Sequence, residues 1–125
     1  RAAIKSLEKN DFVFVHVEAP DEAGHNGDLR EKIIAIERFD QLVVGTILAA
    51  FKKKSNCRIL VLPDHATPVT LRTHTADTVC FGVFGQGITG RGFLNYSEKE
   101  SEKSDLIFKN GYQLMDFFIN GSRKV

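Results

Sequence analysis

The amino-acid sequence predicts an α/β fold, with a mostly parallel sheet flanked by helices. Three short apolar runs at 12–18, 58–63 and 78–84 are rich in β-branched and aromatic residues, as is typical of buried strands. A long amphipathic stretch at 28–54 separates the first run from the second. A strand, a crossover helix and a second strand in this order favour a right-handed βαβ unit with parallel pairing.

The first predicted strand covers residues 12–18 and contains a histidine at position 16. Because His16 lies inside an apolar run, we interpret it as a core residue or as support for a nearby site. Pro20 and the glycine-containing stretch 24–27 are expected to end the strand, and a polar loop is expected to follow.

The stretch 28–54 has the periodicity of one long helix. Its apolar residues recur at steps of three, four and seven, which marks one helical face. They are Leu29, Ile33, Ile36, Val43, Ile47 and Phe51. Asp28 is placed to cap the start of the helix, and the lysines at 52–54 would complement its C-terminal partial charge.

The second predicted strand, 58–63, ends at Pro63, and the third, 78–84, leads into a glycine-rich stretch at 85–92. This stretch lacks the spacing of a phosphate-binding loop, so turn formation is the better interpretation of its glycines.

The C-terminal part of the sequence predicts two more helices. Ser97 and Glu100 have the spacing of a capping box, which predicts a short helix. The apolar residues between 112 and 119 indicate a closing helix packed on the sheet.

Composition suits one ordinary globular domain. The 125 residues include 17 lysines and arginines against 16 acidic residues, a formal charge of +1, which argues against a nucleic-acid partner. No apolar run approaches the ~20 residues that cross a membrane. Cys57 and Cys80 lack metal or redox spacing, so we expect reduced thiols and a cytoplasmic protein. The chain starts without methionine, in what looks like the end of a helix, which suggests a fragment.

Acidic and imidazole side chains gather directly after the predicted strands. Asp21 and His25 follow the first strand, Asp64 and His65 follow the second, and His74 lies between the second and the third. The carboxyl ends of parallel strands open onto one shared crevice. We therefore expect these two carboxylates and three imidazoles to converge.

This mixture of ligands suits Zn²⁺ or Mn²⁺. Five groups are too many for one zinc ion with an open catalytic position, but they fit two ions ~3.5–4 Å apart that clamp a phosphoryl group. Each group alone has a plainer interpretation: Asp21 as a turn or cap residue, and Asp64 with His65 as a strand-end turn. The hypothesis therefore depends on the five residues sharing one edge.

Several stretches resemble the archaeal-type 2,3-bisphosphoglycerate-independent (cofactor-independent) phosphoglycerate mutases, which belong to the alkaline phosphatase superfamily. The similarity runs from about residue 12 to residue 119, and three of the stretches carry metal motifs. The similar stretches are 15–25 with 27–28, 36–40, 60–68, 72–75, 97–100 and 103–104.

The resemblance implies an alkaline-phosphatase-like fold, incomplete here, around two divalent ions. It implies that Asp21, His25 and His74 hold one ion and that Asp64 and His65 hold the other. The nucleophilic serine or threonine is expected upstream of this chain. Residues 1–125 would then form the C-terminal part of a metal-binding, phosphatase-like catalytic domain. Alone, it is expected to hold one ion or none and to be inactive.

The implied activity of the full-length parent is the interconversion of 3- and 2-phosphoglycerate, a step of glycolysis. The expected partners are a phosphorylated small molecule and the rest of the parent chain, with no nucleic acid and no membrane. Arg72, Asp77 and His16 are candidates for contact with the substrate or support of the site, although a structural ion pair suits Arg72 equally. One alternative is a related phosphotransferase or phosphatase, such as a homoserine-kinase-like enzyme, and another is a non-catalytic α/β domain.

Overall fold

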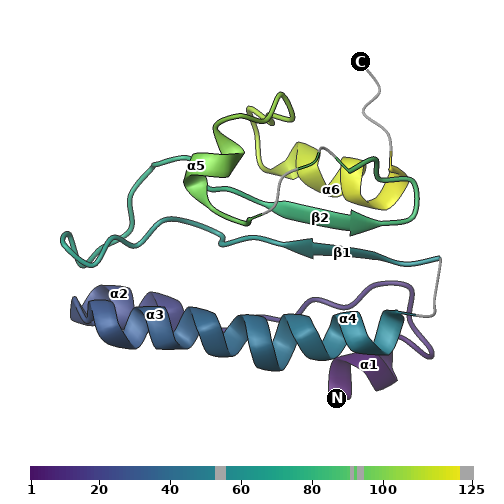
Figure 1. Ribbon diagram of the computed structural model, residues 1–125, viewed down its shortest axis with the longest axis horizontal. Helices are drawn as coiled ribbons and strands as arrows, with labels where there is room; N and C mark the ends of the chain where they lie inside the picture. Colours follow the sequence, from purple (N-terminus) through teal and green to yellow (C-terminus); the bar gives the residue numbers. More distant parts are fainter. Residues whose placement is uncertain (53–55, 91, 93–94, 122–125) are drawn as a thin grey trace. The chain divides into compact units, whose positions relative to one another are not determined.

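The computed structural model describes residues 1–52, 56–90, 92 and 95–121 (Figure 1). The chain divides into two compact units. Unit 1 consists of Arg1–Lys53 and Ala66–Ala76, and unit 2 consists of Lys54–His65 and Asp77–Val125. The segment Ala66–Ala76 therefore belongs with the N-terminal helices, although unit 2 flanks it on both sides in the sequence.

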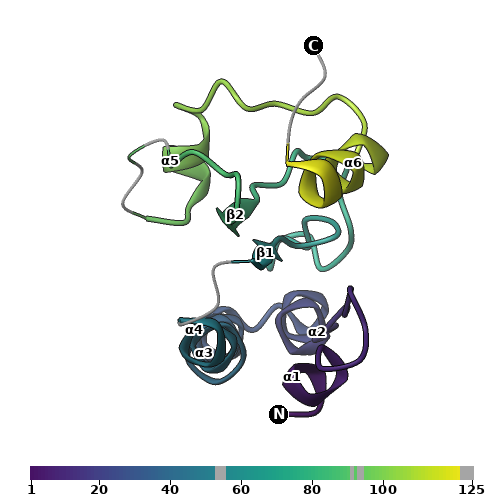
Figure 2. The ribbon, with the colours of Figure 1, turned by 90° about the vertical axis from the view of Figure 1, so that its right-hand side faces the viewer.

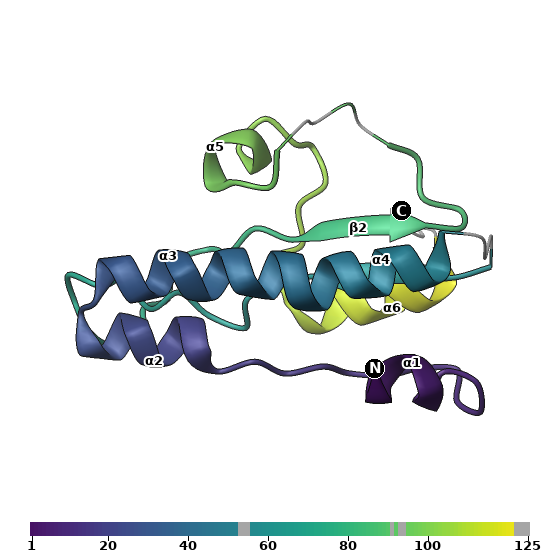
Figure 3. The same cartoon turned by 60° about the horizontal axis from the view of Figure 1, so that its bottom comes forward.

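Unit 1 is built from helices. They are α1 (Ala2–Ser6), α2 (Ala19–Asn26), α3 (Leu29–Arg38), the π-helical segment η1 (Phe39–Val44) and α4 (Gly45–Phe51). Helix α2 packs against α3, and the two lie side by side in Figure 3. Ala23 of α2 and Ala35 of α3 are buried, because small side chains let two helices approach closely.

The long helix predicted from residue 28 is confirmed. The Asp28 side chain accepts a hydrogen bond of 2.9 Å from the Glu31 N–H group, which caps the start of α3. Segments α3, η1 and α4 then follow one another without a break to Phe51. Seen nearly end-on in Figure 2, α3 and α4 overlap, so the π-helical segment does not kink the helix. Lysines 53 and 54 lie outside the described residues.

The strand predicted at 12–18 is wrong for the described structure. None of these residues is in a strand, and Phe12, Phe14, Val15 and Val17 are exposed. An apolar alternation indicates a segment that can be buried, but a strand also needs a neighbour to share its hydrogen bonds. The described residues of unit 1 include no strand that could pair with it.

The predicted polar loop after this segment is also wrong, because residues 19–26 form helix α2. Pro20 lies in the first turn, where its fixed φ suits a helix and its missing N–H costs nothing. Asp21 and Glu22 follow it, and carboxylates are favoured at a helix N-terminus. Gly27 ends the helix in the left-handed conformation, with φ of 70°.

Unit 2 contains the one sheet of the described residues. Strands β1 (Arg58–Val61) and β2 (Gly82–Gly85) pair antiparallel, as the opposed arrows in Figure 1 show. The described residues thus contain both helices and strands, as an α/β fold requires. Their sheet is antiparallel, so the mostly parallel sheet that the sequence predicts is not confirmed. Parallel pairing needs a crossover connection, usually a helix. No helix lies between residues 62 and 81. The chain reverses its direction over these residues, so that β2 runs antiparallel to β1.

The predicted C-terminal helices are confirmed as α5 (Glu98–Ser101) and α6 (Tyr112–Asn120). The Ser97 hydroxyl accepts a hydrogen bond of 3.3 Å from the Glu100 N–H group, as a helix cap should. The Glu100 carboxylate pairs with Lys103. The turn interpretation of the glycine-rich stretch agrees with φ values of 123° at Gly85 and 72° at Gly87.

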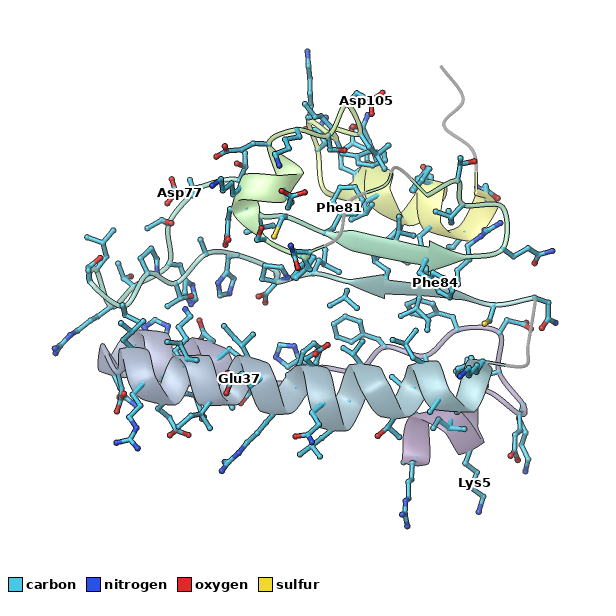
Figure 4. The ribbon with its side chains drawn as sticks, in the orientation of Figure 1. Lys5, Glu37, Asp77, Phe81, Phe84 and Asp105 are labelled. Atoms are coloured by element: carbon cyan, nitrogen blue, oxygen red, sulfur yellow. The ribbon has the colours of Figure 1, made fainter. Side chains whose placement is uncertain are left out.

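Aromatic side chains form a cluster in unit 2. Phe81, labelled in Figure 4, contacts Phe108 with ring centroids 5.7 Å apart. Phe108 in turn contacts Phe117 of α6, with centroids 5.5 Å apart. Tilted aromatic pairs of this kind add to the free energy of area burial. Leu114, also on α6, is 6% exposed, so this helix contributes to the core of the unit.

Arg58 ties β1 to the end of α6. Its Nη1 donates hydrogen bonds of 2.8 Å and 2.5 Å to the carbonyls of Phe118 and Ile119, and its Nε donates one of 2.5 Å to the carbonyl of Gln86. The last carbonyls of a helix lack partners within the helix, and a cation there is favourable. Gly121 permits this approach, because a Cβ atom there would lie 2.3 Å from the Arg58 guanidinium.

Replacing Arg58 with methionine is expected to destabilise unit 2 by about 2 kcal/mol, since charged hydrogen bonds contribute about 1.5–3 kcal/mol each and these are partly exposed. The midpoint of urea unfolding measures the effect. Arg30→Met, on the exposed surface of α3, is the matched control and should change the midpoint little. Equal midpoints for the two variants would refute the structural role of Arg58.

Both cysteines, Cys57 and Cys80, are half-buried and are not joined in a disulfide. Among the helices of the described residues, none combines the length and the apolar character needed to cross a bilayer.

Candidate metal centre

Helix α2 places an acid and an imidazole on one helical face. Asp21 and His25 are four residues apart, and side chains at this spacing lie above one another on a helix. Nε2 of His25 lies 3.4 Å from Oδ2 of Asp21. The sequence predicted that these two residues could serve one ion, and the helix supplies the geometry that a loop would have had to provide.

The segment Ala66–Ala76 brings a second imidazole to the same place. A turn joins the Arg72 N–H to the Pro68 carbonyl at 2.9 Å, and the Thr75 N–H donates to the Ala66 carbonyl at 3.0 Å, which closes the loop. His74 lies next to this closing bond. Its Nε2 lies 3.4 Å from Oδ1 of Asp21 and 3.0 Å from Nε2 of His25.

The backbone of Arg72 fixes the orientation of His25. The carbonyl of Arg72 can only accept a hydrogen bond, so Nδ1 of His25, 3.0 Å away, is the donor. In the neutral imidazole this leaves a lone pair on Nε2, the nitrogen that faces Asp21 and His74. Arg72 has a φ of 54°, unusual for a residue with a side chain. Its guanidinium lies against Gly27, where a Cβ atom would come within 2.4 Å of Nε.

The spacing of these three side chains fits a metal ion. An ion with tetrahedral ligands at ~2.0–2.2 Å needs donor atoms about 3.3–3.6 Å apart. Each imidazole nitrogen lies 3.4 Å from one oxygen of the Asp21 carboxylate, and the two nitrogens lie 3.0 Å apart, which is close to this spacing. A backbone carbonyl behind a ligating histidine is the usual arrangement around metals, because it fixes the tautomer. Between 36% and 49% of each side chain is exposed, so further ligands can approach.

Asp64 and His65 lie in unit 2, directly after Pro63. Nε2 of His65 is 3.4 Å from Oδ2 of Asp64, whose Oδ1 accepts a hydrogen bond of 3.1 Å from the His65 N–H group. These two predicted ligands thus face each other, as adjacent residues can in an irregular segment. Their convergence with Asp21, His25 and His74 stays a prediction.

The three supporting candidates have different outcomes. His16 is exposed, stacks on Phe14 with centroids 6.0 Å apart, and has its Nε2 3.7 Å from the Glu18 carboxylate. Its interpretation as a core residue is therefore wrong, since the strand that would have buried it is not formed. Arg72 supports the site through its backbone carbonyl. Asp77, labelled in Figure 4, lies in unit 2 on the segment before β2.

Sequence analysis missed Thr67 and Lys32. The Thr67 hydroxyl donates to Oδ1 of Asp21 at 2.5 Å, and the Lys32 ammonium donates to the Thr67 carbonyl at 2.5 Å. Thr67 is only 5% exposed. A sequence signal for Thr67 existed, since it is a polar residue two positions after His65 and directly before Pro68. No comparable signal exists for Lys32, which looks like any surface lysine of an amphipathic helix.

Gly24 lets the Thr67 segment approach α2. A Cβ atom at Gly24 would lie 2.6 Å from the Thr67 carbonyl oxygen and 2.9 Å from its Cγ2. Gly24→Ala is therefore expected to destabilise unit 1 by about 1–3 kcal/mol through overpacking, although alanine favours helices. Thermal unfolding tests this against Gly111→Ala, whose Cβ would meet nothing within 4 Å. A Gly24→Ala protein as stable as the control would contradict the close approach.

The sequence matches a known family and is similar to several known proteins. The sequence pattern of the Metalloenzyme superfamily matches residues 1–120. A protein of Geobacter sulfurreducens named "Probable 2,3-bisphosphoglycerate-independent phosphoglycerate mutase" is 44% identical over 120 residues, which is 95% of this chain and 30% of that protein. The 2,3-bisphosphoglycerate-independent phosphoglycerate mutase of Methanothrix thermoacetophila is 47% identical over 122 residues, 97% of this chain and 31% of the relative.

A solved structure, that of the PH0037 protein from Pyrococcus horikoshii, superposes with a TM-score of 0.90 at 29% identity. The match covers 99% of this chain and 38% of that one. The chain thus spans about a third of the length of the relatives that it matches.

Proposed function

Because the chain belongs to the Metalloenzyme superfamily, we propose that it is the C-terminal, metal-binding portion of a 2,3-bisphosphoglycerate-independent phosphoglycerate mutase. The observation that carries the proposal is the cluster of Asp21, His25 and His74, whose donor atoms lie 3.0–3.4 Å apart. The similar proteins are named phosphoglycerate mutases, and the reaction that we propose for the full-length protein is the interconversion of 3- and 2-phosphoglycerate, a step of glycolysis. The full-length enzyme would then work in the cytoplasm on a phosphorylated small molecule, together with the rest of its own chain.

In this proposal Asp21, His25 and His74 hold one divalent ion, Mn²⁺ or Zn²⁺, and Asp64 with His65 contributes to a second. The ions would supply Lewis-acid charge that lowers the pKa of the nucleophile and neutralises the phosphoryl group. The carboxylates of Asp21 and Asp64 provide negative charge. The Arg72 carbonyl, by holding the Nδ1–H group of His25, keeps the Nε2 lone pair directed at the centre.

The alternative of a homoserine-kinase-like phosphotransferase would use the same ligands. The named relatives favour the mutase, since proteins from several organisms at 36–51% identity carry that name. A non-catalytic α/β domain would not need a cluster of two imidazoles and a carboxylate held by outer hydrogen bonds.

The discriminating experiment uses the full-length protein supplied with Mn²⁺ or Zn²⁺. One coupled assay follows conversion of 3-phosphoglycerate to 2-phosphoglycerate, and a second follows ATP-dependent phosphorylation of homoserine. The expected result is mutase turnover without kinase turnover. Kinase turnover alone would overturn the substrate assignment, and absence of bound metal would overturn the metal centre itself.

A further inference from the structure

Both the side chain and the backbone of Thr67 are held by neighbouring helices. Its Cγ2 lies against Gly24 of α2, where a Cβ atom would come within 2.9 Å. Its carbonyl accepts the hydrogen bond of 2.5 Å from Lys32 of α3. Threonine is also stiff about χ1, because two heavy atoms branch from Cβ. With 5% of the residue exposed, the hydroxyl has a fixed direction.

The Thr67 hydroxyl faces Asp21 of the proposed metal centre. The hydroxyl donates to Oδ1 of Asp21 at 2.5 Å, a short bond of the kind formed with a charged acceptor. Asp21 lies three residues before Gly24, so both face the Thr67 segment from the same side of α2. The two contacts, one polar and one apolar, therefore align Thr67 with α2.

The carboxylate of Asp21 has to face two imidazoles at once. Its Oδ1 lies 3.4 Å from Nε2 of His74 and its Oδ2 lies 3.4 Å from Nε2 of His25. A rotation about the bond that carries the carboxylate would spoil both distances. The hydrogen bond from Thr67 opposes that rotation.

We propose that Thr67 is a positioning residue of the metal centre, which acts by holding the Asp21 carboxylate in its ligating orientation. The inference rests on the proposed metal-binding function. Outer hydrogen-bond partners of metal ligands typically change metal affinity by about 10–100-fold when they are removed. Thr67 is not expected to touch the metal or the substrate.

The test compares two substitutions that separate the hydroxyl from the shape of the side chain. Thr67→Val keeps the branched shape and loses the hydroxyl, whereas Thr67→Ser keeps the hydroxyl and loses the methyl group that lies against Gly24. Metal-free full-length protein is titrated with Mn²⁺ by calorimetry and with Co²⁺ by visible absorption, which reports ligand geometry. Thermal unfolding of both variants is measured in parallel.

Thr67→Val is expected to weaken the binding of one ion by about 10–100-fold and to change the Co²⁺ spectrum, while Thr67→Ser stays close to the unsubstituted protein. A purely structural role would give the reverse order, with the serine variant less stable and both variants binding metal normally. That outcome, or a Thr67→Val protein with unchanged affinity, overturns the inference.

His25→Ala separates this failure from failure of the proposed function. If His25→Ala removes one binding event and Thr67→Val changes nothing, the metal centre stands and the role of Thr67 falls. If the unsubstituted protein binds no ion, the metal centre and the role of Thr67 are both overturned. The same follows if the His25→Ala variant binds metal as tightly as the unsubstituted protein.

Discussion

Replacing His25 with alanine in the full-length protein is expected to remove one metal-binding event and to slow phosphoglycerate interconversion by about a thousandfold. The side chain contributes the Nε2 atom that lies 3.4 Å from Oδ2 of Asp21 and 3.0 Å from Nε2 of His74. A bound ion contributes several kcal/mol to a phosphoryl-transfer transition state. Each 1.36 kcal/mol corresponds to about tenfold in rate, so loss of ~4 kcal/mol gives about a thousandfold.

His16→Ala is the matched control for this substitution. It removes the same chemical group from an exposed position, where the ring contacts Phe14 and Glu18. Calorimetric titration with Mn²⁺ and a coupled assay should both leave His16→Ala near the unsubstituted protein. Equal metal affinity in the His16→Ala and His25→Ala variants would contradict the proposal that Asp21, His25 and His74 bind an ion.

The 125-residue chain alone is expected to show no interconversion of 3- and 2-phosphoglycerate, even with excess Mn²⁺. Its sequence has proposed metal ligands but no motif that activates a serine, threonine or cysteine as a nucleophile. Transfer through a covalent intermediate needs that nucleophile as well as the ions. Coupled assays of the chain and of the full-length protein, at equal concentration, measure the difference.

His65→Ala in the full-length protein should abolish the same activity, since His65 is a proposed ligand of the second ion. His16→Ala again provides the control. Turnover by the isolated chain would show that its own residues supply the nucleophile. An active His65→Ala enzyme would argue against a two-metal mechanism.

Local signals in the sequence predicted the helices well. The long helix after Asp28 and the cap at Ser97 depend on periodicity and on hydrogen bonds between residues three positions apart. Such interactions are contained within a few residues, so the sequence displays them directly. Helix α2 was missed because Gly24 and Gly27 were interpreted as residues that break regular structure. In the structure Gly24 lies inside the helix and Gly27 caps its C-terminus.

Strand pairing could not be predicted in the same way. The patterns at 58–63 and 78–84 indicated strands. Strand β1 lies within the first pattern and β2 overlaps only the end of the second, but alternation does not specify the direction of a partner. The segment 12–18 has a strand-like pattern as well, but the pattern does not say whether a partner strand is present, and these residues form no strand. Several of its apolar side chains are exposed. Pairing is a property of two segments, and each pattern describes one.

The site was predictable where chemistry is visible in residue type. Asp21, His25 and His74 were predicted from their positions after predicted strands and were assigned to one ion by the family resemblance. The structure brings their side chains together. Arg72 was a candidate for support of the site, but the sequence could not show how it acts, because the contact comes from a backbone carbonyl that any residue could present. Thr67 was overlooked although it lies two positions after His65, because a hydroxyl at that position does not show by itself that it will face Asp21.

The helical character of α2 imposes a strict length on the segment between Asp21 and His25. Each residue of an α-helix turns the chain by about 100° and advances it by 1.5 Å. One inserted residue would swing His25 around the helix and away from Asp21, whereas a loop could absorb the insertion. Evolution or a protein engineer could therefore vary the length of the turn between Pro68 and Arg72 more freely than the length of this four-residue interval.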